Sequence, residues 1–169
     1  QPTKLKALRL TEVLDWAGDA LNRVNKTEFF AKFEAARSVQ YFYEPFLEAF
    51  DPELRKELGV WYTPEEIVRY QVARVDEVLR SELGLDNGLA HPDVVVLDPC
   101  CGTGTYLVEV LRVIGERYKA QGIDALAAHR LKQAVTSRLF GFELLPAPYV
   151  VAHLQLGLLL RHLGVALTD

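Results

Sequence analysis

The stretch Val94–Leu111, VVVLDPCCGTGTYLVEVL, decides the fold of this chain. It opens with a continuous apolar run, Val94 to Leu97, which is typical of a strand covered on both faces in a parallel sheet. A glycine-broken turn follows, and an amphipathic helix is expected from about Thr103. The stretch therefore predicts a strand, a turn and a helix, which together are the repeating unit of an open α/β sheet.

The same pattern continues after this unit. A further helix is expected over residues 123–137, and SRLFGFEL is predicted to be a second buried strand that ends at Glu143. The apolar run APYVVAHLQLGLLLRHLG is predicted to be a helix that Gly164 closes. The order strand, helix, helix, strand, helix assigns this part of the chain to the α/β class.

A well-marked helix is predicted before the unit, within YTPEEIVRYQVARVDEVLRSELG. Thr63 is expected as its N-cap, Pro64 at its first helical position and Glu66 as the capping-box partner. Gly84 is expected to end it.

Helical signals also fill the N-terminal part of the chain. Residues 27–50 follow a helical pattern rich in phenylalanine and tyrosine, and a short helix is expected from Pro52 to a stop at Gly59. We therefore divide the chain into a helical N-terminal region, residues 1–58, which could couple the rest of the chain to other domains, and an α/β region, residues 59–169.

The composition limits the classes of function. The 169 residues are 50% hydrophobic and 25% charged, which is the balance of a globular domain. No apolar stretch is long enough to cross a bilayer and the start lacks a signal-peptide pattern, so we expect a cytoplasmic protein without a membrane partner. The net charge of −4 gives no overall attraction for nucleic acid. The two cysteines, Cys100 and Cys101, are adjacent, which excludes a disulfide framework, and no metal site is predicted.

The turn after the first strand predicts a ligand site. In α/β sheets, ligands bind beyond the carboxyl ends of the strands, where a glycine turn such as Gly102–Gly104 lets the backbone come close. A phosphate-binding P-loop is excluded because no lysine follows, and a dinucleotide fingerprint lacks its third glycine, since Leu107 stands there. Asp98 suits a ligand with a cationic end. Glu143, at the end of the second strand, can accept both hydroxyls of a ribose.

Three segments resemble motifs of the amino-methylating DNA methyltransferases. DPCCGTGTYL resembles their motif I, GVWYTPEEIV resembles motif X, and LFGFELLPAPYVVAHLQL resembles motif II with its following helix. The order X, I, II is that of the adenine-specific enzymes of Type I and fused restriction–modification systems. FYEPFLEAFDPELRKELGVWYTP is similar to large single-chain restriction enzymes that join a helicase-like motor to a methyltransferase.

The resemblance implies a fold, a cofactor and a set of contact residues. The fold is a partial Rossmann-like sheet of an S-adenosylmethionine-dependent methyltransferase, preceded by an α-helical region. The cofactor is S-adenosyl-L-methionine, with Thr63 at its carboxylate, Asp98 at its amino-acid end, Glu143 at its ribose and Leu144 beside its adenine. The full set of implied cofactor contacts is Thr63, Asp98, Pro99, Gly102, Thr103, Gly104, Thr105, Glu143 and Leu144.

One family motif does not occur in this sequence, namely the catalytic tetrapeptide Asn/Asp-Pro-Pro-Tyr/Phe. We therefore expect no catalytic residue here, and a cofactor half of a methyltransferase that does not methylate by itself. The resemblance implies double-stranded DNA as the partner of the intact protein, with a helicase-like or nuclease domain in the same polypeptide. Two alternatives stay open: a helical coupling module of a multidomain restriction enzyme, and a methyltransferase acting on RNA or protein, because the motifs report the cofactor and not the acceptor.

Overall fold

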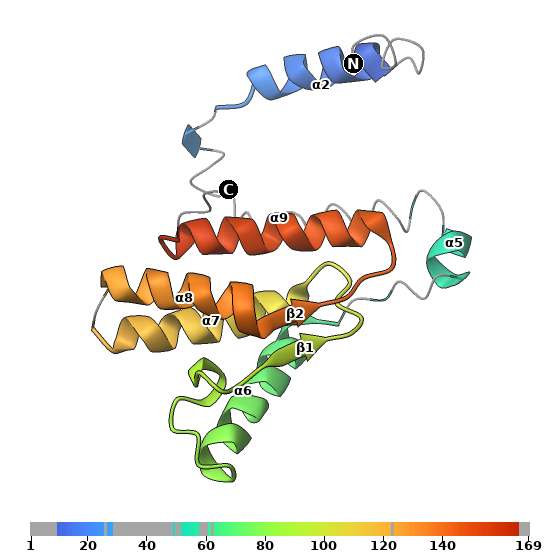
Figure 1. The fold of residues 1–169 in the computed structure, drawn as a ribbon. Helices are drawn as coiled ribbons and strands as arrows, with labels where there is room; N and C mark the ends of the chain where they lie inside the picture. The colour runs from blue at the N-terminus through green and yellow to red at the C-terminus, as the bar shows by residue number, and fades with distance from the viewer. Residues whose placement is uncertain are drawn as a thin grey trace. The chain divides into compact units, whose positions relative to one another are not determined.

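A computed structural model describes residues 10–25, 27–28, 49, 52–57, 61, 63–122 and 124–165. The chain forms two units, Gln1–Glu34 and Ala35–Asp169. Figure 1 shows the elements in chain order, and the first unit contains α2. The described elements are α2 (Leu10–Asn22), α5 (Pro52–Glu57), α6 (Glu65–Ser81), the 3-10 helix η1 (Gly88–Ala90), β1 (Val96–Asp98), α7 (Thr105–Ala120), α8 (Asp124–Arg138), β2 (Leu139–Gly141) and α9 (Pro146–His162).

The two strands are parallel neighbours, as predicted. Val96 pairs with Leu139, and Asp98 pairs with Gly141. The hydrogen-bond ladder continues past both strands, because the Phe142 N–H donates to the carbonyl of Asp98 at 2.9 Å and the Cys101 N–H donates to the carbonyl of Phe142 at 2.9 Å. The carboxyl ends of β1 and β2 therefore meet at one edge of the sheet.

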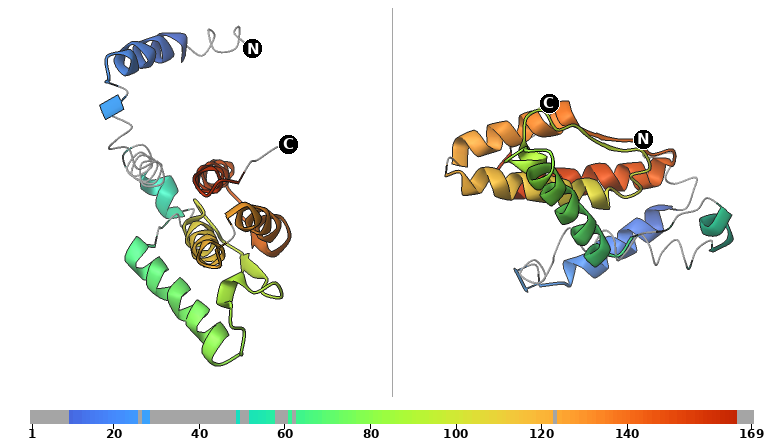
Figure 2. Two further views of the ribbon diagram at one scale, coloured as in Figure 1. Left: turned by 90° about the vertical axis from the view of Figure 1, so that its left-hand side faces the viewer. Right: turned by 90° about the horizontal axis from the view of Figure 1, so that it is seen from below.

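Helix α7 is central in the second unit, since it contacts α6, α8, α9 and η1. The left view of Figure 2 looks along α7, α8 and α9, and α6 runs across them. The buried core joins α6, η1, Val94 before β1, α7, α8 and α9, and Leu111 of α7 is fully buried within it. Val96 and Leu139, one from each strand, pack against this core.

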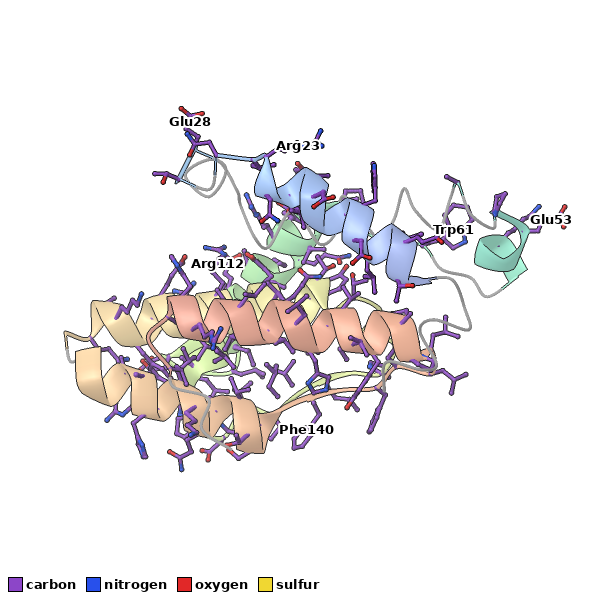
Figure 3. The ribbon with its side chains drawn as sticks, turned by 90° about the horizontal axis from the view of Figure 1, so that it is seen from above. Arg23, Glu28, Glu53, Trp61, Arg112 and Phe140 are labelled. Atoms are coloured by element: carbon purple, nitrogen blue, oxygen red, sulfur yellow. The ribbon has the colours of Figure 1, made fainter. Side chains whose placement is uncertain are left out.

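Only one face of the sheet is covered in the described part of the chain. The residues that alternate with Val96 and Leu139 are exposed: Val95 (62%), Leu97 (55%), Phe140 (45%, labelled in Figure 3) and Phe142 (62%). The prediction of strands covered on both faces is wrong for these residues. The apolar runs identify the strands correctly, but the described helices supply a layer to one side alone.

The N-terminus of α6 differs from the sequence-based expectation. Helix α6 begins at Glu65 with Pro64 as its N-cap, and no side chain caps it, so Thr63 is not the N-cap and Glu66 forms no capping box. The reason is the backbone of Pro64, whose ψ of 142° is extended, so that the helix begins only after it. Its carbonyl accepts from the Ile67 and Val68 N–H groups.

The remaining helices lie close to their predicted positions. Helix α8 matches the expectation for 123–137, and α9 ends two residues before Gly164, whose φ is +80°. Helix α5 begins at Pro52 as expected, while its predicted stop at Gly59 and most of the helix predicted over 27–50 lie outside the described residues. Among the helices that the structure describes, none combines the length and the apolar character needed to span a membrane.

A buried carboxylate ties α6 to its neighbours. Asp76 is 4% exposed, and its Oδ1 accepts a hydrogen bond from the Leu89 N–H at 2.9 Å. Its Oδ2 accepts from Arg117 of α7 at 2.7 Å and from Arg80 at 3.1 Å. One side chain of α6 therefore holds η1 and α7 in place.

A second network fixes the segment that leads into β1. Arg138, the last residue of α8, donates to the carbonyls of His91 at 2.6 Å and Val94 at 2.8 Å. The Tyr118 hydroxyl of α7 donates to the carbonyl of Ala90 at 3.0 Å. The segment that leads into β1 is therefore held from α7 and α8.

Candidate functional site

The turn between β1 and α7 has a backbone that glycine favours. Gly102 and Gly104 have φ values of +55° and +85°, in the left-handed region that other L-residues rarely adopt. The Gly104 N–H donates to the carbonyl of Cys101 at 2.7 Å, which closes the turn. Helix α7 begins at Thr105 rather than Thr103, because Gly104 interrupts the helical backbone.

Helix α9 packs directly on this turn. A Cβ at Gly104 would lie 3.0 Å from the Cβ of Ala152, so a side chain there would force α9 to shift by a few tenths of an ångström. The Gln155 Nε2 donates to the carbonyl of Thr103 at 3.0 Å, and both side chains are buried. No sequence pattern points to Gln155, because nothing local distinguishes one glutamine in a helix.

The two carboxylates selected from the sequence meet at this edge of the sheet. The Asp98 Oδ1 accepts from the Cys100 N–H at 3.2 Å, and the Glu143 Oε1 accepts from the Leu145 N–H at 2.8 Å. The Cys101 thiol lies in the field of both, since burial, then Asp98, then Glu143 raise its pKa. The edge therefore carries two acidic groups beside one turn.

One carboxylate oxygen of Asp98 is buried and has no hydrogen-bond partner among the residues that the structure describes. Its Oδ2 is out of contact with solvent and accepts no hydrogen bond within the described residues. A buried carboxylate oxygen without a donor is unfavourable, because desolvation is not compensated. Such an atom is a natural acceptor for a ligand that brings its own N–H donor.

The other residues predicted to contact the cofactor lie in different surroundings. Leu144 is 96% exposed beside Glu143, and Pro99 is exposed at the end of β1. The Thr103 and Thr105 hydroxyl oxygens lie 3.5 Å apart at the start of α7. Thr63, half-buried before α6, makes no hydrogen bond to the turn in the part of the chain that the structure describes.

A groove runs along the edge of β1 that is unpaired in the described part of the chain. It has a volume of about 760 Å³ and lies between α6, residues 94–99 and α7. Its lining is predominantly apolar, with Asp98 and Pro99 at the carboxyl end of the strand. The Tyr106 hydroxyl of α7 donates to Gln71 of α6 beside it. Within the described ranges, no three His, Cys, Asp or Glu side chains gather so as to hold a metal ion.

Comparison with known proteins assigns this chain to a family. Residues 37–164 match the family described as N-6 DNA Methylase. The chain belongs to this family. The resemblance drawn from motifs X, I and II is thereby confirmed. No protein among the curated sequences matches the chain.

Several solved structures are similar to this chain, among them three of larger proteins. LlaBIII, an ATP-dependent Type ISP restriction-modification enzyme bound to DNA, has a TM-score of 0.63 at 26% identity over 76% of this chain. The DrdV–DNA complex has a TM-score of 0.61 at 30% identity over 76%. A nuclease-deletion mutant of the Type ISP enzyme LlaGI, in complex with a DNA substrate mimic, has a TM-score of 0.56 at 27% identity over 65%. This chain spans only 8–11% of the length of those chains.

Proposed function

We propose that this chain forms the S-adenosylmethionine-binding part of a DNA adenine-N6 methyltransferase from a restriction–modification system. The observation that carries the proposal is the Oδ2 of Asp98, which is buried beside a left-handed glycine turn and has no hydrogen-bond partner among the described residues. It lies at the sheet edge that also bears Glu143. Membership of the N-6 DNA Methylase family supports the reaction, and the similarity to restriction-modification enzymes supports the context.

The residues present fit this cofactor. The Asp98 oxygen that receives no donor from the described residues suits the ammonium of the methionine moiety, which brings N–H donors and a positive charge. Glu143 suits the ribose, because a carboxylate accepts from two hydroxyls, and the exposed Leu144 next to it is available to the adenine ring. Thr63 remains the proposed partner of the methionine carboxylate, and the first N–H groups of α7, which lack acceptors within the helix, face the same turn.

The role of this chain in the reaction is positioning. When bound, S-adenosylmethionine supplies a methyl group that is already activated by the positive charge on sulfur. Asp98 and Glu143 would hold the two ends of the molecule so that its methyl group points in one direction, which converts a bimolecular encounter into an oriented one. The proposed acceptor is the amine of an adenine flipped out of double-stranded DNA. Because the acceptor-binding tetrapeptide is not in this sequence, we expect no methylation by this chain alone.

The exposed face of the sheet bears on the fold of the intact protein. A parallel strand is ordinarily covered on both faces, yet Leu97 and Phe140 are exposed and the edge of β1 borders a groove. We propose that the sheet is part of a larger Rossmann-like sheet in the natural polypeptide. A helicase-like or nuclease domain in the same polypeptide is proposed from the similarity to the much longer restriction-modification enzymes.

The test is methyl transfer by the full natural polypeptide. Radiolabelled S-adenosylmethionine is offered with duplex DNA, RNA or protein as acceptor, and N6-methyladenine is measured by mass spectrometry. Glu143→Gln is expected to raise the KM for the cofactor by about tenfold, since it removes hydrogen bonds to a charged group. The matched control is Glu116→Gln, on the exposed side of α7. Label in RNA or protein instead of DNA would overturn the acceptor assignment.

A specific observation also favours the coupling module as a second function. Helix α2 is amphipathic, and within its own unit its apolar side chains are exposed: Val13 (58%), Leu14 (56%), Trp16 (72%) and Leu21 (64%). Exposed apolar side chains in such number mark a protein contact surface. Self-association without cofactor affinity in the natural polypeptide would favour this function over the first.

A further inference from the structure

The turn of the proposed cofactor site is held by a residue far away in the sequence. Gln155 lies on α9, 52 residues after Thr103, and its Nε2 donates to the Thr103 carbonyl at 3.0 Å. Gln155 is 4% exposed and Thr103 is 1% exposed, so water does not compete for this bond. It is the only buried polar side chain of α9, whose other buried residues are Pro148, Ala152 and Leu160.

A buried amide in an apolar helix has an energetic cost that packing alone does not explain. Transfer of an amide out of water is unfavourable unless the group is hydrogen-bonded, whereas leucine would fill a similar volume without that cost. Without Gln155, the carbonyl of Thr103 would itself be buried without this donor. The glutamine therefore serves the turn and not only the core.

The hydrogen bond acts on one peptide group that is held from both ends. The carbonyl of Thr103 accepts from Gln155, and the N–H of the same peptide, that of Gly104, donates to the carbonyl of Cys101 at 2.7 Å. Because a peptide group is planar, the two bonds together fix its rotation. Rotation of this peptide is the movement that neighbouring glycines would otherwise allow, since they adopt left-handed and right-handed backbone about equally well.

We propose that Gln155 is a positioning residue for S-adenosylmethionine, which locks the Thr103–Gly104 peptide so that the turn keeps its ligand-binding conformation. The inference rests on the proposed function and adds a residue of the helix after motif II that is not among the implied cofactor contacts. Ala152 assists from one turn earlier on α9, where it packs against Gly104. Gln155 itself need not touch the cofactor.

The test compares two buried hydrogen bonds to backbone carbonyls in the full natural polypeptide. Gln155→Leu removes the donor at the turn. The matched control, Tyr118→Phe, removes the hydroxyl that donates to the buried carbonyl of Ala90 at 3.0 Å, away from the turn. Calorimetric titration gives the Kd for S-adenosylmethionine, thermal melting gives stability, and steady-state kinetics separate KM from kcat.

The expected result is a loss of cofactor affinity that stability does not explain. Gln155→Leu should raise the Kd and the KM for S-adenosylmethionine by about tenfold or more while kcat at saturation stays within about twofold. Tyr118→Phe should lower the melting temperature and leave the Kd unchanged. Gln155→Met, which keeps an unbranched side chain, is the second variant if the leucine variant does not fold.

Two outcomes would overturn the inference, and they are distinct. Equal cofactor affinity in the wild type and in a folded Gln155 variant would reduce Gln155 to a core residue while leaving the proposed function in place. A folded wild type that binds no S-adenosylmethionine would remove the proposed function itself, and the inference with it.

Discussion

Replacing Asp76 by asparagine is predicted to cost far more stability than replacing its neighbour Glu77 by glutamine. Both changes remove one negative charge from α6 with almost no change in shape. Asp76 is buried and bonded to Leu89, Arg80 and Arg117. Glu77 is 56% exposed and pairs across the helix surface. The pair of variants therefore isolates the effect of burial on one helix.

The size of the effect follows from the bonds that are lost. Asparagine can still accept from the Leu89 N–H, but both arginines lose a charged acceptor. A hydrogen bond to a charged group contributes about 1.5–3 kcal/mol. Because the Arg80 and Arg117 side chains are 43% and 28% exposed, solvent screening lowers the total loss of stability to roughly 2–3 kcal/mol. In a chain of this size that loss lowers the melting temperature by roughly 5–10 °C.

The assay is urea unfolding of the full chain followed by circular dichroism. Asp76→Asn should shift the midpoint to lower urea with an unchanged slope, and Glu77→Gln should leave the midpoint where it is. Equal stability of the two variants would refute the reasoning, because it would mean that the buried carboxylate does not hold α6 against η1 and α7.

Two further predictions concern the glycines of the loop after α6 and the cysteines of the turn. Gly88→Ala should destabilise the chain more than Gly84→Ala, because both have positive φ but a Cβ at Gly88 would lie 2.1 Å from the Asp76 carboxylate, whereas the space around Gly84 is open; similar melting temperatures would contradict this. Iodoacetamide should label the exposed Cys100 before Cys101, because burial and two nearby carboxylates raise the pKa of the Cys101 thiol. The difference between the two labelling rates should narrow as the pH rises through the raised pKa of Cys101. Tandem mass spectrometry measures the label on each cysteine, and faster labelling of Cys101 than of Cys100 at neutral pH would contradict the prediction.

Much of the fold was predictable because its signals are local. The apolar run before Asp98 and the glycine pair after it predict the strand, turn and start of α7 within two residues. The apolar periodicity gives α8 and α9. The shared edge of Asp98 and Glu143 follows from the parallel pairing of two successive strands.

Other features depend on contacts that no local pattern encodes. Asp76 accepts a hydrogen bond from Arg117, 41 residues away, and Gln155 donates one to Thr103, 52 residues away. A single aspartate or glutamine in a helical sequence does not reveal such partners. The N-cap of α6 is Pro64 rather than the predicted Thr63. The sequence Thr-Pro-Glu-Glu is compatible with a helix that begins at Pro64 or at Glu65, and only the extended ψ of Pro64 distinguishes the two. The apolar strand sequences predict a sheet that is buried on both faces. Whether the second face is buried depends on which other elements pack against it, and the strand sequence alone does not specify them.

The central claim is most directly tested by calorimetric titration of S-adenosylmethionine into the full natural polypeptide, with two isosteric variants compared. Asp98→Asn changes the carboxylate whose buried Oδ2 has no hydrogen-bond partner in the described part of the chain, and Asp93→Asn changes one whose side chain is 87% exposed. The account predicts saturable binding in the wild type and in Asp93→Asn, and its loss in Asp98→Asn. Undiminished binding in Asp98→Asn would contradict it.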